Sequence, residues 1–154
     1  MSKSTNTALR RLEQCTTEHD KRIFSFNDPG TNNRFTVKTK GRRCRKVKIE
    51  GALTEIQPNK CDWCLWDYDN NVFVFFELKG SDLKHAAKQL GCTISWFKAN
   101  VRPFSIYRET YVIVRQSSSI PSSNTKAQTI RATFLRKYKS VLRSKHSGDQ
   151  LSFL

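Results

Sequence analysis

Several features that define other classes of protein are missing from this chain. No apolar run approaches the ~20 residues that a helix needs to cross a bilayer. The opening residues, MSKSTNTALRRLEQ, lack the apolar core of a secretory signal peptide. We therefore expect a cytoplasmic protein with no membrane partner.

Cysteine occurs five times, in no pattern that indicates a disulfide framework. An odd number of thiols cannot all pair, and a cytoplasmic chain keeps its thiols reduced. The CxxC at residues 61–64 has the spacing of one half of a zinc site, for which Cys44 and Cys92 are candidate further ligands. A structural zinc site needs two such pairs on tight turns, whereas this pair lies in an expected strand. Buried thiols are the preferred interpretation, and zinc is the alternative.

Acidic residues are scarce, with 13 Asp and Glu against 28 Lys and Arg, a formal net charge of +15. Residues 1–49 and 83–154 each hold thirteen basic residues, with four and two acids respectively. Residues 50–82 hold seven acids and only Lys60 and Lys79. Because Lys and Arg neutralise phosphates and release counterions, nucleic acid is the expected partner. An acidic segment within a basic chain indicates metal ligands surrounded by a phosphate-binding surface.

The apolar pattern predicts one domain, residues 1–154, of the α/β (α+β) class. Dense apolar runs at 63–66 and 72–78 indicate buried strands joined as a hairpin by DYDNN. A helical stripe follows Ser81, the expected N-cap, and YVIVR at 111–115 is a further buried strand. This order is typical of a central mixed β-sheet flanked by helices.

The flanking segments are predicted from weaker patterns. Residues 5–19 suit a short helix, and residues 23–50 suit short strands, the last of them half-buried, with Lys46 and Lys48 on its polar face. A basic amphipathic helix is expected over 126–139. The tail to residue 154 is interpreted as a hairpin turning at Ser147-Gly148.

The expected hairpin brings three charged residues together. Glu77 and Lys79 stand two apart at the end of a strand, so they project to the same face. If the two apolar runs pair, Asp62 joins them. Asp62, Glu77 and the main-chain carbonyl of Leu78 then offer the oxygen ligands that Mg²⁺ or Mn²⁺ prefers. Such an ion polarises a phosphate and lowers the pKa of an attacking water.

Asp62, followed by Glu77-Leu78-Lys79 at a strand end and then by the helix DLKHAAKQL, resembles the PD-(D/E)xK nuclease superfamily over about residues 45–115. Cys61 stands where the name of the family has proline. The resemblance implies a restriction-endonuclease-like core, related to that of Holliday junction resolvases. It also implies that Asp62 and Glu77 bind metal and that Lys79 acts on the nucleophile or the phosphate.

The resemblance also implies accessory residues. Members often have an additional acid before the triad, for which Glu50 is our choice, with Glu55 second and Glu13 or Glu18 after it. The family often places Gln or Lys on the following helix, which points to Gln89 or Lys84.

Two groups of basic residues are candidates for phosphate contacts. The first is the run Arg42, Arg43, Arg45, Lys46 and Lys48, and the second, on the last expected helix, holds Arg131, Arg136, Lys137 and Lys139. Contacts of this kind position the backbone without reading sequence. They fit a structure-selective or weakly sequence-specific endonuclease, for which a homodimer is plausible.

We therefore expect a Mg²⁺- or Mn²⁺-dependent endonuclease that hydrolyses phosphodiester bonds in DNA. One alternative is a non-catalytic, basic nucleic-acid-binding module whose acids are structural. Another is an RNA-cleaving toxin or defence nuclease that uses the same site.

Overall fold

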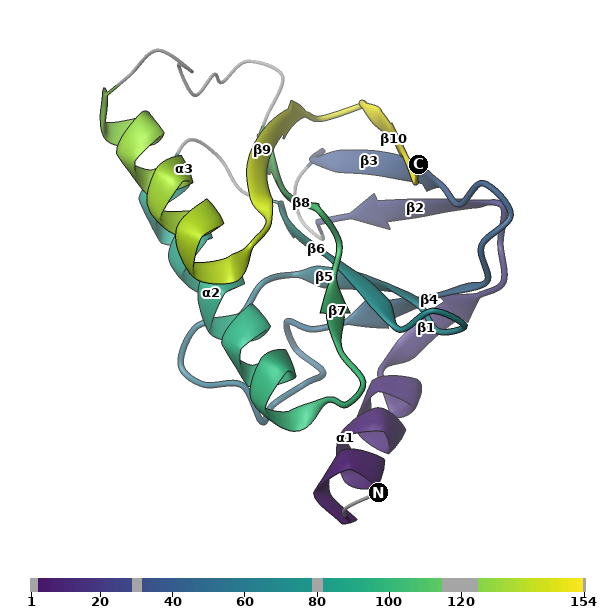
Figure 1. Cartoon of the computed structure of the whole chain (residues 1–154). Helices are drawn as coiled ribbons and strands as arrows, with labels where there is room; N and C mark the ends of the chain where they lie inside the picture. The colour runs from purple at the N-terminus through teal and green to yellow at the C-terminus, as the bar shows by residue number, and fades with distance from the viewer. Residues whose placement is uncertain (1–2, 29–31, 79–81, 115–124, 154) are drawn as a thin grey trace.

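The chain folds into three layers: helices, a large mixed sheet and a small second sheet (Figure 1). The computed structural model describes residues 3–28, 32–78, 82–114 and 125–153, with side chains from Thr7 onward. Within these ranges the helices are α1 (Lys3–Gln14), α2 (Leu83–Asn100) and α3 (Thr125–Tyr138). The strands are β1 (Thr16–His19), β2 (Ile23–Asn27), β3 (Arg34–Lys38), β4 (Cys44–Lys48), β5 (Trp63–Asp67), β6 (Val72–Leu78), β7 (Ser105–Ile106), β8 (Glu109–Val114), β9 (Val141–His146) and β10 (Gln150–Ser152).

The large sheet is antiparallel at one side and parallel at the other. Its order over the described residues is β1-β4-β5-β6-β8-β9, with the short β7 pairing with β6. Strands β4, β5 and β6 form an antiparallel meander. Strands β6, β8 and β9 run parallel, so α2 and α3 serve as the crossover connections that parallel neighbours require. The sheet is therefore mixed, as predicted.

Alternate residues of β6 enter two separate cores. Phe73 and Phe75 face the helices, where they pack with Phe97 of α2. Val74 and Phe76 face the small sheet, which is formed by β2, β3 and β10. This two-sided burial explains why β6 has a nearly continuous apolar sequence.

An aromatic cluster joins the two sheets. Phe26 of β2 and Phe35 of β3 stack with ring centroids 4.7 Å apart, and both contact Phe76 at 5.1 and 4.7 Å. Phe76 in turn stacks on Tyr111 of β8 at 5.6 Å. Aromatic pairs at such distances add to the stabilisation that burial of their area gives.

Helices α2 and α3 lie against each other on the opposite face of the large sheet (Figure 1). Gly91 permits this close approach, because a Cβ there would collide with the Tyr138 hydroxyl of α3. The α2 helix continues through Gly91, and its N-cap is Asp82, whose carboxylate accepts a hydrogen bond from the His85 amide at 3.0 Å. The expected cap, Ser81, lies outside the described residues.

The α/β fold class, with helices flanking a central mixed sheet, is confirmed. The hairpin at 63–78, the helix after it, the buried strand near 111–115 and the basic helix near 126–139 are all present.

Within the part of the chain that the structure describes, no helix is both long enough and apolar enough to cross a membrane.

Two local predictions are wrong. Residues 16–19 form strand β1 beside β4 instead of extending the first helix. The tail is not a hairpin, because β9 pairs with β8 in the large sheet and β10 pairs with β3 in the small sheet. In both segments, pairing with strands distant in sequence outweighs the local pattern.

The aromatic cluster gives a first prediction. Substituting Phe76→Ala should lower the free energy of unfolding by about 3–5 kcal/mol, because it removes a buried ring and leaves a cavity. Ile23→Ala, on a β2 side chain that is 46% exposed, should change it by less than about 1 kcal/mol. Urea denaturation of both variants measures the difference, and equal losses would contradict this role of Phe76.

Candidate active site

The register of the β5–β6 hairpin places the two predicted carboxylates opposite each other. Trp63 pairs with Phe76, so the next positions outward in the same register are Asp62 and Glu77. Directly opposed residues of an antiparallel pair have Cβ atoms about 5 Å apart and share one face. That face is the helical one, because Cys64, two residues after Asp62, and Phe75, two before Glu77, both lie in the helical core.

A hydrogen bond fixes Asp62 at this position. Its Oδ2 accepts from the main-chain amide of Leu78 at 2.8 Å, across the hairpin. The Asp62 carbonyl accepts from the amide of Ile49 at 3.1 Å, which joins the same residue to the end of β4. Asp62 is therefore held between two strands at the edge of their paired region.

The two carboxylates differ in exposure. Glu77 is 0% exposed, whereas Asp62 is partly exposed. The thiol of Cys61 is also fully buried; burial raises its pKa well above the ordinary value, and the negative charges of Glu77 and Asp62 add to that effect. The site is thus a buried acidic centre whose solvent side is Asp62.

Buried polar side chains of α2 connect that helix to the residues preceding Asp62. The Thr93 hydroxyl accepts a hydrogen bond from the Cys61 amide at 2.9 Å and donates to the Gln89 carbonyl at 2.9 Å. The Gln89 side-chain amide donates to the Lys60 carbonyl at 3.3 Å. Gln89 is 8% exposed, so it is buried beneath the segment that precedes Asp62 instead of standing on an open surface. Thr93 was not predicted, although its place four residues after Gln89 on an apolar face was a usable signal.

The candidate accessory acids lie at different places. Glu50 is exposed, and its amide approaches the Asp62 carbonyl at 3.4 Å, so its main chain borders the site. Glu55 forms an ion pair with Arg11 of α1 at 2.7 Å. Glu18 pairs with Lys21 at 2.9 Å, and Glu13 is exposed on α1. Of the four, Glu50 has the most direct connection to Asp62.

The oxygen donors of this site suit a hard divalent cation that takes only a few of its ligands from the protein. Mg²⁺ commonly takes one or two carboxylates and completes its shell with water and substrate phosphate. Asp62 and Glu77 are two such carboxylates, and the Leu78 carbonyl stays a predicted third ligand. The described residues contain no cluster of three or more Asp, Glu, His or Cys that could hold a metal, so a multidentate protein cage, including the alternative zinc site, has no support there. Lys79, the third member of the predicted triad, lies outside the described residues.

The basic run at residues 42–48, most of which lies on β4, is largely engaged within the fold. Arg42 contacts the buried Asp67 at 3.3 Å, and Arg43 makes a two-pronged contact with Asp69 at 2.8 and 3.0 Å. Arg45 lies over the rings of Trp66 and Tyr68. These arginines stabilise the end of β5 and the turn after it, where Asp67, the last residue of β5, also accepts hydrogen bonds from Asn70.

Lys46 does not occupy the exposed position that was expected. It is 9% exposed, and its ammonium donates to the Ser25 carbonyl of β2 at 2.5 Å. Burial lowers its pKa. The expectation of a solvent-facing strand was wrong here because the small sheet covers that face of β4.

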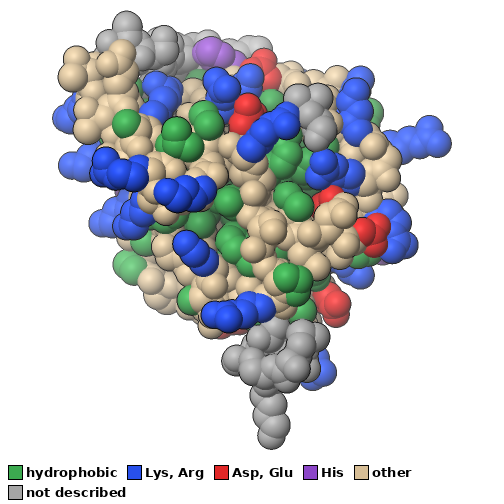
Figure 2. Space-filling model, in the orientation of Figure 1, with side chains coloured by type: hydrophobic (Ala, Val, Ile, Leu, Met, Phe, Trp, Pro, Cys, Tyr) green, Lys and Arg blue, Asp and Glu red, His purple; other side chains and the backbone are tan. Residues whose placement is uncertain are grey.

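Basic residues of the helical layer are more accessible. Lys84, Arg136 and Lys137 are exposed on α2 and α3, while Arg131 is half-buried and donates to the Ser144 hydroxyl at 2.9 Å. Figure 2 shows Lys and Arg side chains gathered over these helices, with acidic side chains confined to other parts of this face. The phosphate-binding surface predicted for the last helix therefore remains open to a partner.

No described protein family, curated protein or solved structure matches this chain. The interpretation of the site therefore depends on its geometry and on the resemblance of its residues to the PD-(D/E)xK motif.

The link between α2 and the acidic centre gives a second prediction. Thr93→Val should lower the free energy of unfolding by about 1–3 kcal/mol, since the buried Cys61 amide loses its acceptor. Thr129→Val, on an exposed hydroxyl of α3, is the matched control and should have little effect. Chemical denaturation compares the two, and similar midpoints for both variants would count against the proposed connection.

Proposed function

We propose that this protein is a Mg²⁺- or Mn²⁺-dependent endonuclease of the PD-(D/E)xK type that hydrolyses DNA. The observation that carries the proposal is the hydrogen bond from the Leu78 amide to the Asp62 carboxylate, which holds Asp62 beside the end of β6, where Glu77 lies. A carboxylate pair at strand ends, followed by a helix, is what the sequence resemblance implies for the metal site. The mixed sheet agrees with the core that the resemblance implies.

Each residue has a distinct role in this proposal. Asp62 and Glu77 would bind the ion, with the Leu78 carbonyl as a third ligand. When bound, the ion polarises the scissile phosphate and lowers the pKa of the attacking water. Lys79 would stabilise negative charge on the phosphate or position the nucleophile, and Glu50 would assist at the exposed side. The hydrogen bond from the Leu78 amide keeps Asp62 oriented toward the site.

Burial of Glu77 is compatible with this role. A charged carboxylate removed from water needs a balancing positive charge or a set of hydrogen bonds. A bound divalent cation supplies such a charge, and the partly exposed Asp62 gives it a route to solvent and substrate.

The charge distribution supports a phosphate-rich substrate. The segments that form α2 and α3 contain no acidic residue, and Lys84 stands in the first turn of α2, close in sequence to Glu77. DNA remains our preferred substrate, and RNA is tested alongside it. Cytoplasmic location and a homodimer also remain proposals.

A second candidate is a non-catalytic, basic nucleic-acid-binding module. The complete burial of Glu77 favours it, since a fully enclosed carboxylate is also suited to a structural role. This candidate predicts salt-sensitive binding of nucleic acid without metal-dependent cleavage.

Cleavage by the purified protein distinguishes the two. We expect Mg²⁺ or Mn²⁺ to support cleavage of supercoiled, linear, single-stranded or branched DNA, and a chelator to abolish it. Asp62→Asn should reduce the rate by at least about 100-fold, because even second-shell substitutions at metal sites cost 10–100-fold. The asparagine oxygen can still accept from the Leu78 amide, so the fold is preserved.

Asp69→Asn is the matched control, because it makes the same change at the opposite end of the same hairpin. It should leave cleavage within about twofold of the parent rate. Binding without cleavage under every metal condition would support the non-catalytic module. Cleavage at equal rates by the two variants would show that Asp62 is not part of the active site. Cleavage confined to RNA would favour the ribonuclease alternative.

A further inference from the structure

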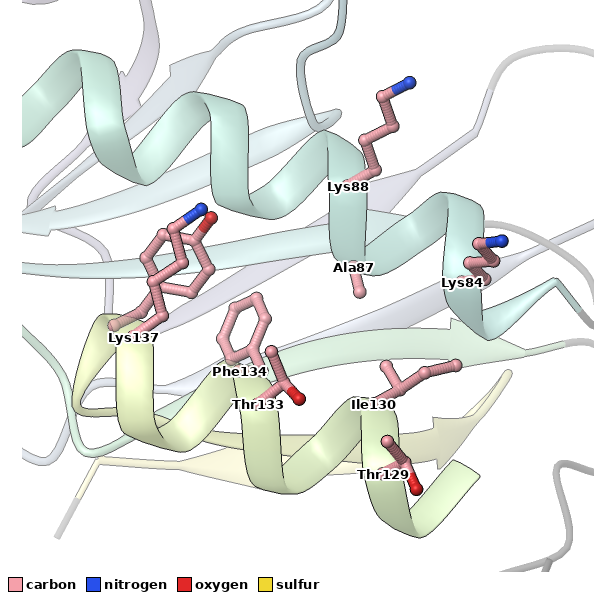
Figure 3. Close-up of a pocket in the computed structure, with 9 residues that line it drawn as sticks. Lys84, Ala87, Lys88, Thr129, Ile130, Thr133, Phe134 and Lys137 are labelled. Atoms are coloured by element: carbon pink, nitrogen blue, oxygen red, sulfur yellow. The ribbon is translucent and has the colours of Figure 1, made fainter. Parts of the chain in front are cut away.

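A solvent-facing groove runs between α2 and α3, on the helical layer. Its floor is formed by Ala87 of α2 and by Ile130, Phe134 and Tyr138 of α3. In Figure 3, Ala87 points from α2 toward α3, and Ile130 and Phe134 point back toward α2. The hollow has a volume of about 270 Å³, enough to receive a few aliphatic side chains.

Lysines stand along both walls of this groove. Lys84 and Lys88 come from α2, and Lys137 comes from α3. All three are exposed, and no ion pair among the described residues involves any of them. Because neither helix contains Asp or Glu, the positive charge along the groove is not balanced by its own walls.

We propose that the groove binds an acidic amphipathic helix of a partner protein. An amphipathic helix places spaced apolar side chains in a hydrophobic groove between two helices. Glutamates or aspartates beside that stripe would face the three lysines, which is the charge complementarity that steers and selects a partner. The α3 wall from Thr129 to Tyr138 is about 14 Å long at 1.5 Å per residue, so the partner would contribute between two and three turns.

A nucleic-acid backbone fits this groove less well. Phosphates would pair with the lysines, but they make no apolar contact with the floor. Phe134 is only 3% exposed, so it offers little ring surface for base stacking. The acidic helix uses both parts of the groove. The inference does not rest on the nuclease proposal, because the groove includes neither Asp62 nor Glu77.

The experiment uses the full chain and a synthetic helical probe. A labelled peptide of about 15 residues, with leucines on one helical stripe and glutamates elsewhere, is titrated by fluorescence anisotropy. A scrambled peptide of the same composition, with no continuous stripe, is the peptide control. We expect the amphipathic peptide to bind at least about tenfold more tightly than the scrambled one.

Matched protein variants locate the binding surface. Thr133→Glu and Lys88→Glu place negative charge at the groove and should each weaken binding by about tenfold. Ala132→Glu and Lys98→Glu make corresponding changes at exposed positions of the same helices outside the groove, and should change affinity by less than about twofold. Asp62→Asn should bind the peptide like the parent protein, which separates this result from any result on cleavage.

Three outcomes would overturn the proposal. The first is equal binding of the ordered and scrambled peptides. The second is equal loss of affinity in the groove and control variants, which would indicate nonspecific attraction. The third is absence of peptide binding together with duplex DNA binding that Thr133→Glu and Lys88→Glu weaken, which would assign the groove to nucleic acid.

Discussion

The antiparallel register of β5 and β6 is the constraint on which the arrangement of the acidic centre depends. It sets Asp62 opposite Glu77, and the hydrogen bond from the Leu78 amide to Asp62 holds that arrangement at the end of the hairpin. A shift of one residue in this register would turn one carboxylate to the opposite face of the sheet. The aromatic residues of β6 prevent such a shift, since Phe75 and Phe76 would exchange cores.

Two layers cover the large sheet and decide which charged residues near the acidic centre are buried. The helices bury Glu77, and the small sheet buries the opposite face, including Lys46. Thr93 and Gln89 then join α2 to the residues just before Asp62. The same helix contributes Lys84 and Lys88 to the basic outer surface. Charge is therefore separated between an enclosed acidic centre and a basic exterior.

Local sequence signals predicted the part of the fold that contains the candidate site. The apolar runs around DYDNN specified a short-range hairpin, and the stripe after residue 82 specified α2, because in both cases the pattern and the contacts are close in sequence. The same local hairpin led to the prediction that Asp62 lies at its end, where the Leu78 amide donates to the Asp62 carboxylate.

Signals of this kind could not predict pairing between distant segments. Strand β10 pairs with β3, more than a hundred residues earlier, and β1 pairs with β4 across some thirty residues. Lys46 was expected on a polar face because its own strand alternates, and nothing local indicated a second sheet above it. The buried hydrogen bonds of Thr93 also depend on tertiary packing, so its role became visible only in the fold.

Binding of Mn²⁺ to the whole protein is a direct test of a metal site at Asp62 and Glu77, since it needs no knowledge of the substrate. Electron paramagnetic resonance can follow the loss of the free-ion signal during titration. We expect saturable binding by the parent protein and by Asp69→Asn, and strongly weakened binding by Asp62→Asn. Equal binding by all three proteins, or no saturable binding by the parent, would contradict a metal site at Asp62 and Glu77.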